Sequence, residues 1–160
     1  MTIKVGDKVP SVKIKHMTKD GVKDITTDEI FGGKKVALFA LPGAFTPTCS
    51  AKHLPGFLQN ASSIKGKGVS TIACLSVNDA FVMDAWGKNQ NVGDNILMLA
   101  DGNAELTKAL GLEMDGTGYG MGTRSRRYSM LVDNGVVKQL NVEKPGAFEV
   151  SNAETMLKQL

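Results

Sequence analysis

Cysteine is scarce in this chain, which has two cysteines in 160 residues, Cys49 and Cys74, and no C-x-x-C pair. This content excludes the dense disulfide framework of small secreted domains. In a reducing compartment, thiols are more often catalytic, redox-active or buried than joined to each other. We therefore expect two free thiols in a cytoplasmic protein.

Long apolar runs are lacking as well. None approaches the ~20 residues needed to cross a bilayer, and Pro42 interrupts the longest run. Residues 1–10 show neither the apolar core of a signal peptide nor an Arg/Ser-rich transit pattern. The sequence predicts no membrane segment and, again, a cytoplasmic location.

Signals for nucleotides, nucleic acids and metals are missing too. There is no G-x-G-x-x-G or P-loop to hold a nucleotide. The net charge is only +3, and the single basic cluster, at 124–127, is too small to indicate a nucleic-acid partner. Cys49, His53 and Cys74 lack a fourth ligand and metal-type spacing. We expect no cofactor, no metal and no nucleic-acid partner.

What the chain does have is the composition of a globular domain, with 42% hydrophobic and 22% charged residues. We expect one domain over residues 1–160, which would bury roughly 70% of the surface of its unfolded chain. Apolar runs predict strands over 11–17 (at a sheet edge), 36–41, 69–77, 96–100, 128–133 and 136–140. Helices are predicted from Thr26, from Cys49, after Asn78-Asp79, over 104–112 and from Ser151.

Local signals support these assignments. Thr26-x-x-Glu29 and Ser151-x-x-Glu154 are capping-box patterns, and Asn134-Gly135 between two apolar runs indicates a type I′ hairpin. The order of elements predicts an α/β domain, with a mixed central β-sheet flanked by helices on both faces. This topology suits a thioredoxin-like fold.

Residues 41–50 are the most informative stretch, because they link a predicted buried strand to a predicted helix through a turn that ends at Cys49. Thr48 is a favourable N-cap residue, which would place Cys49 at the first helical position, near unpaired amides. An ordinary cysteine titrates near ~8.5, and a helix N-terminus or a cation lowers that value. Pro42 and Pro47 restrict the turn, and Thr46 supplies a hydroxyl. The alternative is a buried cysteine on an amphipathic helix.

The spacing Pro42-x-x-x-Thr46-x-x-Cys49 resembles the active-site motif of the peroxiredoxins. The surrounding residues are similar to the type II (peroxiredoxin-five-like) subfamily. Further similar segments are 53–57, 74–82, 99–102, 126–132 and 140–143, so the resemblance extends along the whole chain.

The resemblance implies a thiol peroxidase that reduces hydrogen peroxide and small alkyl hydroperoxides through a sulfenic acid on Cys49. It implies a glutaredoxin, glutathione or thioredoxin reductant, and a homodimer with Phe45 and Phe81 in its contact. It also implies chemistry that needs no metal, flavin or haem. A peroxide sensor or redox-regulated holdase would use the same oxidation and is the alternative function.

The resemblance also assigns supporting roles around Cys49. Thr46 Oγ–H, the Cys49 amide and Arg127 would donate to the developing charge on the peroxide, and Pro42 would shield the thiolate. Strand alternation places Arg127 on the face of Ser129 and Leu131, so it can point inward. We expect Arg124 and Arg126 to belong to a solvated basic patch.

Cys74 and His53 have open roles. By resemblance, Cys74 is a possible resolving cysteine; as a residue of a central strand, it is equally a small apolar filler. His53 lies one turn after Cys49, which would suit a Cys–His hydrolase dyad, but no orienting carboxylate or amide is evident. We expect His53 at the rim of the site or against a partner subunit. A thioredoxin-like disulfide reductase is disfavoured, because Thr46 occupies the position of the first cysteine of a C-x-x-C pair.

Overall fold

The structure is a computed structural model and describes residues 2–160. In chain order the elements are β1 (Lys13–Thr18), β2 (Gly21–Thr26), α1 (Thr27–Phe31), β3 (Lys35–Ala40), η1 (Cys49–His53), α2 (Leu54–Gln59), α3 (Ala61–Gly66), β4 (Thr71–Ser76), α4 (Ala80–Asn89), β5 (Leu97–Ala100), α5 (Glu105–Leu110), β6 (Glu113–Asp115), η2 (Thr117–Tyr119), β7 (Thr123–Ser125), β8 (Tyr128–Asp133), β9 (Val136–Val142) and α6 (Ala153–Gln159).

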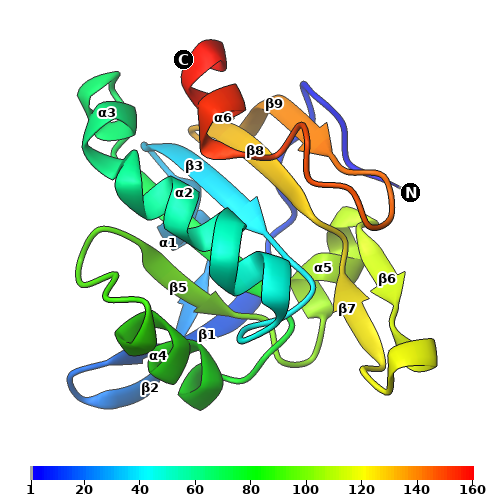
Figure 1. The fold of residues 1–160 in the computed structure, drawn as a ribbon. Coiled ribbons are helices and arrows are strands. Elements are labelled where there is room, and N and C mark those ends of the chain that lie inside the picture. The colour runs from blue at the N-terminus through cyan, green and yellow to red at the C-terminus, as the bar shows by residue number, and fades with distance from the viewer. Residues whose placement is uncertain (1) are drawn as a thin grey trace.

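Seven strands form a mixed sheet in the order β2-β1-β5-β4-β3-β8-β9, and β6 pairs with β7 in a separate small sheet (Figure 1). β3, β4 and β5 run parallel, whereas β8 and β9 are antiparallel. The predicted edge position of the first strand was wrong. β2 pairs outside β1 and makes the edge, because its largely exposed residues suit a solvent-facing border.

The sheet is covered on both faces, as the sequence predicted. Along β3, Ala37 and Phe39 face the cluster with α2, α3, α4 and α6, while Val36 and Leu38 face the cluster with α1 and α5. Burial on both faces explains why the central strands are continuously apolar instead of alternating. The mixed sheet and its two helical layers confirm the thioredoxin-like architecture.

Two of the predicted capping and turn signals are confirmed, and the third lies one residue away from its predicted position. The Thr26/Glu29 capping box starts α1, and Asn134-Gly135 turns with positive φ at both residues (48° and 81°). The last helix, however, is capped by Asn152, whose side chain accepts from the Thr155 amide. Ser151 therefore does not cap this helix.

The segment between α5 and β8 was not predicted as structure. It forms the β6–η2–β7 excursion, whose short strands hold Glu113–Asp115 against Thr123–Ser125. The excursion matters because it carries Arg124 to the motif turn, where its Nη1 donates to Pro42 O at 3.2 Å. Among residues 2–160, no helix has both the length and the apolar character to cross a membrane.

Candidate active site

Cys49 lies in the first turn of a helix that directly follows the β3 turn. Helical structure begins at Pro47, and the Ser50 amide makes the first bond back along the helix, to Thr46 O at 2.9 Å. Proline suits the first helical position, because its missing N–H would be unpaired there anyway. The predicted N-cap was therefore wrong: Thr48 is itself helical (φ −66°, ψ −37°) and makes no side-chain cap.

Residues 49–53 form a π-turn, η1, in which the Leu54 amide donates to Cys49 O, five residues earlier. Pro55 gives a reason for the wider turn, because a proline ring in an α-helix would clash with the carbonyl of Ala51. Both Cys49 and His53 are fully buried on the inner side of this turn. The turn thus presents two polar side chains to one interior point.

Arg127, just before β8, meets both of these side chains. Its Nη2 donates to Cys49 Sγ at 3.1 Å, and its Nη1 is 2.9 Å from His53 Nδ1. The inward orientation agrees with the strand alternation described above. A guanidinium at this distance gives the sulfur a charged hydrogen-bond donor.

His53 is buried, not at a rim, so its predicted position was wrong. Because arginine can only donate, His53 Nδ1 must accept from Arg127, and Nε2 then carries the proton and donates to Ser151 O at 3.0 Å. Desolvation, followed by the Arg127 charge, lowers the pKa of His53 to about 3. A neutral imidazole therefore holds one arm of the guanidinium while the other reaches the sulfur.

Glu143 organises the loop behind His53, a role with no sequence signal. Its carboxylate accepts from the amides of Glu149, Val150 and Ser151 at 2.8–3.0 Å and from Ser151 Oγ at 2.7 Å. Desolvation opposes ionisation of Glu143, but these hydrogen bonds outweigh it and its pKa lies below the usual 4.5. Ser151, freed from helix capping, is thus fixed with its carbonyl towards His53.

The turn before Cys49 is held by two contacts. Thr46 Oγ–H donates to Gly43 O at 2.6 Å, so the hydroxyl proton is engaged and its lone pairs remain to accept. Arg124 binds Pro42 O, and a Cβ at Gly43 would lie 2.7 Å from Arg124 Nη1, so a side chain there would displace the guanidinium from this contact. Arg124 is therefore not part of a solvated basic patch.

Cys74 shares the apolar cluster of Cys49 but has different neighbours. It is fully buried on β4, in register with Phe39 on β3 and Met98 on β5. Desolvation, and next the proximity of Cys49, raise the pKa of Cys74 well above its ordinary value. Both cysteines are free thiols.

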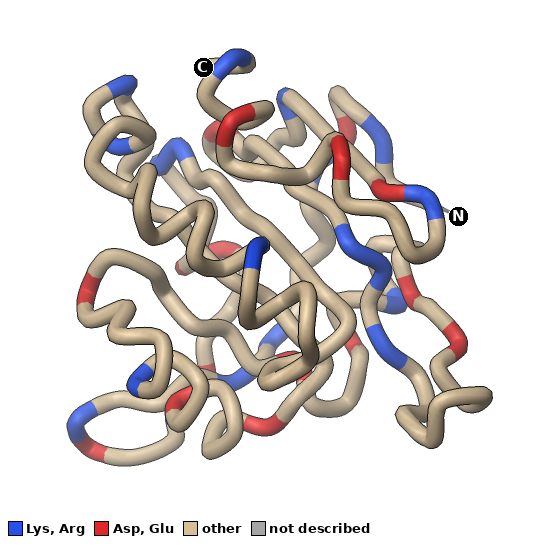
Figure 2. Tube along the Cα trace, viewed as in Figure 1, with Lys and Arg blue, Asp and Glu red and all other residues tan. Residues whose placement is uncertain are grey.

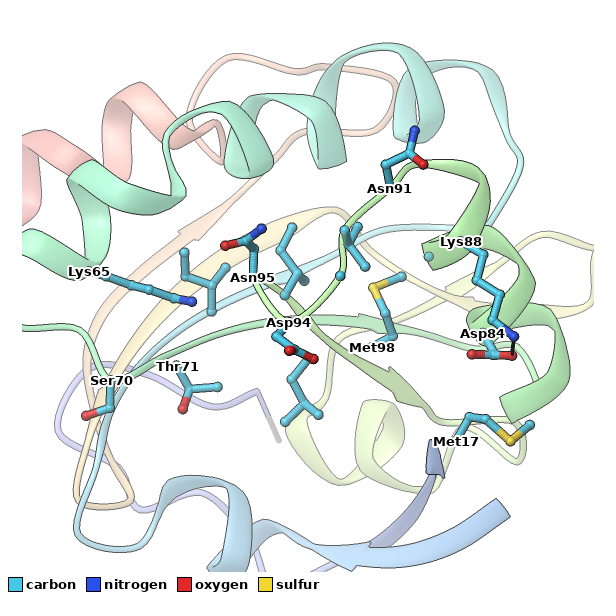
Figure 3. A pocket seen from close by; sticks show the side chains of 16 residues that line it. Met17, Lys65, Ser70, Thr71, Asp84, Lys88, Asn91, Asp94, Asn95 and Met98 are labelled. Atoms are coloured by element: carbon cyan, nitrogen blue, oxygen red, sulfur yellow. Dashed lines mark ion pairs between the residues drawn. The ribbon is translucent and has the colours of Figure 1, made fainter. Parts of the chain in front are cut away.

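Two cavities are candidate sites. One of about 140 Å³ is lined by Pro42, Thr48, Met114, Arg126, Arg127, Glu143, Lys144, Pro145, Gly146 and Ala147. A larger one, of about 760 Å³, lies where β4 and β5 begin, with Lys65, Asp84, Lys88 and Asp94 around it (Figure 3). β3, β4 and β5 are parallel and Cys49 follows the end of β3, so the larger cavity lies at the opposite end of the sheet. The smaller cavity is linked to Cys49 through Arg127, which lines it and donates to the sulfur, and through the neighbouring Thr48. Within residues 2–160, no group of three potential metal ligands occurs.

Comparisons with known proteins agree with this geometry. The Redoxin family model matches residues 4–157. The chain is 56% identical to peroxiredoxin-2E-2, chloroplastic, of Oryza sativa subsp. japonica, over 99% of this chain and 73% of that protein. It is 48% identical to the hybrid peroxiredoxin hyPrx5 of Haemophilus influenzae, over 97% of this chain and 65% of the hybrid.

A solved structure extends the agreement to three dimensions. Reduced Prx3 of Vibrio vulnificus, determined in complex with H₂O₂, superposes with a TM-score of 0.95 at 57% identity, covering 99% of each chain. The family model, the relatives and the fold all indicate the same family, and the buried Cys49–Arg127 contact is consistent with it. The chain belongs to the peroxiredoxins of the Redoxin family, within the type II (peroxiredoxin-five-like) group, and is a thiol peroxidase.

Proposed function

We propose that Cys49 is the nucleophile that reduces hydrogen peroxide and small alkyl hydroperoxides. The observation that carries this proposal is the 3.1 Å contact between Arg127 Nη2 and Cys49 Sγ. Cys49 Sγ attacks the distal oxygen of the hydroperoxide, the O–O bond breaks, and the departing oxygen takes a proton to leave as water or an alcohol. The products are Cys49 sulfenic acid and one reduced oxygen compound, so atoms and electrons balance.

The neighbouring groups support this step in different ways. The Cys49 amide precedes the first helical hydrogen bond and donates to no acceptor within residues 2–160, so it can bind the peroxide oxygen. Arg127 stabilises the charge that develops there. Thr46, with its proton given to Gly43, would accept from the hydroperoxide O–H instead of donating to it. Pro42 lines the adjoining cavity, where its ring would shield the sulfur from bulk water.

The test is peroxide consumption by wild type and by Cys49→Ser with added thiol. We expect no turnover by the variant, and sustained turnover would refute the assignment. The second-order rate constant with hydrogen peroxide should far exceed that of a free thiolate. A value no higher than a free thiolate would instead favour the sensor or holdase.

For the second half of the cycle we propose an external thiol: glutathione, glutaredoxin or thioredoxin. The burial of Cys74 and its raised pKa disfavour Cys74 as an attacking thiolate while the fold is intact. After one equivalent of peroxide, mass spectrometry should find sulfenic acid on Cys49 and, with glutathione present, a mixed disulfide. A Cys49–Cys74 disulfide as the main product would show that the helix turn opens and that Cys74 resolves.

We further propose a homodimer that uses the aromatic residues beside the motif. Phe45 and Phe81 are 54% and 69% exposed, large values for phenylalanine, and Phe45 lies 6.5 Å from the buried Trp86 ring. Sedimentation of the reduced protein should show a dimer that Phe81→Asp weakens, whereas a monomeric wild type would refute it.

The proposed compartment is the cytoplasm, because two free, buried thiols suit a reducing environment. Two relatives are named as chloroplastic proteins, so fractionation of the source cells decides between the compartments.

A further inference from the structure

The small cavity beside Cys49 has an excess of positive charge. Three cationic residues line it, Arg126, Arg127 and Lys144, against one carboxylate, Glu143. The basic segment 124–127 runs next to the loop that follows β9, where Lys144 lies (Figure 2). These cations come from two segments that are distant in sequence and that meet at one opening.

The one carboxylate in the lining forms no ion pair with these cations and offsets only part of their charge. Glu143 accepts hydrogen bonds from Glu149, Val150 and Ser151 within its own loop. Within residues 2–160, the ion pairs involve Lys13, Lys15 and Lys88, and none includes a cation of this cavity. The cavity thus keeps a positive field that a charged ligand would feel.

The two arginines differ in what they already bind. Arg127 is committed to Cys49 and His53, and its guanidinium carbon lies 5.7 Å from the centre of the Phe148 ring. Arg126 makes one long side-chain hydrogen bond, from Nη2 to Glu143 O at 3.4 Å, among the described residues. A guanidinium has five N–H donors arranged for carboxylates, so most of the binding capacity of Arg126 is unused.

We propose that Arg126 and Lys144 form a carboxylate-binding site at the mouth of the cavity, which selects acidic reaction partners for Cys49. This inference rests on the proposed role of Cys49. The volume of about 140 Å³ is below that of cavities that enclose drug-sized ligands, so only one end of a larger molecule enters. The ligand places its carboxylate on Arg126 and Lys144 and its reacting group towards the sulfur.

Two kinds of molecule carry this chemistry: a small acidic thiol and a carboxylated hydroperoxide. For the thiol, its sulfur attacks the Cys49 sulfenic acid, an S–S bond forms, the S–O bond breaks and water leaves. A second thiol then releases Cys49 and a disulfide. For the hydroperoxide, the reaction is the O–O cleavage already described, with the carboxylate unchanged.

The test uses Arg126→Gln, Lys144→Gln and the double variant, with Lys23→Gln as matched control. Lys23 is exposed on β2, at the sheet edge opposite β9. Stopped-flow rates are measured with N-acetylcysteine and its neutral amide on the sulfenic acid, and with linoleic acid hydroperoxide and its methyl ester on the thiolate. The rate constant of each variant is divided by that of wild type with the same reagent, so the intrinsic reactivity of the reagent cancels.

At low ionic strength, we expect the rate constant of the double variant to fall roughly 3- to 10-fold with the acidic member of at least one reagent pair. The neutral member and hydrogen peroxide should change by less than about twofold, and 1 M salt should shrink the difference. A lower rate with the acidic thiol identifies the reductant as the acidic partner. A lower rate with the acidic hydroperoxide identifies the peroxide substrate as the acidic partner.

Equal effects on charged and neutral members, or no effect on either, would overturn the proposal. Hydrogen peroxide separates this failure from failure of the proposed function. If wild type reacts rapidly with hydrogen peroxide but shows no charge preference, Cys49 chemistry stands and only the carboxylate site is refuted.

Discussion

The two cysteines differ in their charged neighbours and not in their burial. Cys49 and Cys74 are both 0% exposed and belong to the same apolar cluster. Cys49, however, lies in the first turn of a helix and receives a hydrogen bond from Arg127, whereas Cys74 lies in mid-strand, paired with Phe39 on one side and Met98 on the other. The difference teaches that an interior sulfur becomes a nucleophile through the donors built around it, since removal from water alone favours the neutral thiol.

The largest expected effect separates the two sulfurs directly. Cys49→Ser should abolish peroxide reduction, because a serine hydroxyl is not ionised by a guanidinium at neutral pH. Cys74→Ser serves as the matched substitution at the other sulfur. The measurement is peroxide consumption with excess thiol. A comparable loss of activity in both variants would show that the two cysteines do not differ in their role.

Removing the donor from Cys49 should make it resemble Cys74. Arg127→Gln is expected to lower the second-order rate constant for hydrogen peroxide by roughly 10²–10³-fold, the scale of a lost transition-state donor. Arg127→Lys should recover only part of the rate, because an ammonium lacks the planar fork that reaches His53 and Cys49 together. Full recovery with lysine would show that charge suffices and geometry does not matter.

The neutral His53 behind Arg127 should make stability depend on pH. Its pKa is about 3 in the folded protein against 6.5 for an ordinary histidine, so below pH 6.5 the unfolded chain takes up a proton that the folded one does not. This contribution is fully present above pH 6.5 and is lost as the pH falls towards 3, at about 1.4 kcal/mol per unit.

Urea unfolding at pH 7.5 and pH 5 measures this loss, expected to be about 2 kcal/mol for wild type. Ionised Glu143, with its pKa below 4.5, stabilises the fold at both of these pH values, and this stabilisation is lost only as the pH falls below about 4.5. His53→Gln removes the titrating group, and an unchanged pH slope in that variant would assign the loss elsewhere.

The smallest effect should be that of Cys74 on catalysis. Cys74→Ala leaves the reaction of Cys49 with peroxide within about twofold, although deletion of a buried atom costs about 1 kcal/mol of stability. Stopped-flow rates and urea unfolding of the same samples check both parts. A tenfold lower peroxide rate at unchanged stability would reveal a role for Cys74 that its apolar surroundings do not suggest.

The sequence was sufficient wherever a short-range pattern carries the information. The apolar runs at 36–41 and 69–77 predicted central strands, and the alternation from Leu131 back to Arg127 predicted the inward guanidinium. The helix begins at Pro47, not at Cys49 as the sequence had predicted. Pro47 and Thr48 both carry helix-start signals, and the sequence alone does not show which of them begins the helix.

Contacts between distant segments had no such pattern. Arg127 and His53 are 74 residues apart, and His53 and Ser151 are 98 apart. Ser151 resembled a helix cap because its neighbours fit a capping box, while its actual role depends on Glu143 in another segment. Arg124 was predicted to be solvated for the same reason, since the β6–η2–β7 excursion that positions it has no clear periodicity.

The π-turn at residues 49–53 bears on which changes in length this chain can survive. Each helical residue turns the chain by about 100°, so deleting one residue between Cys49 and Leu54 would swing His53 and everything after it around the axis. Point replacements at the outward positions Ala51 and Lys52 leave that angle intact. The outward positions of this turn can therefore be substituted, whereas its number of residues cannot change without misplacing His53.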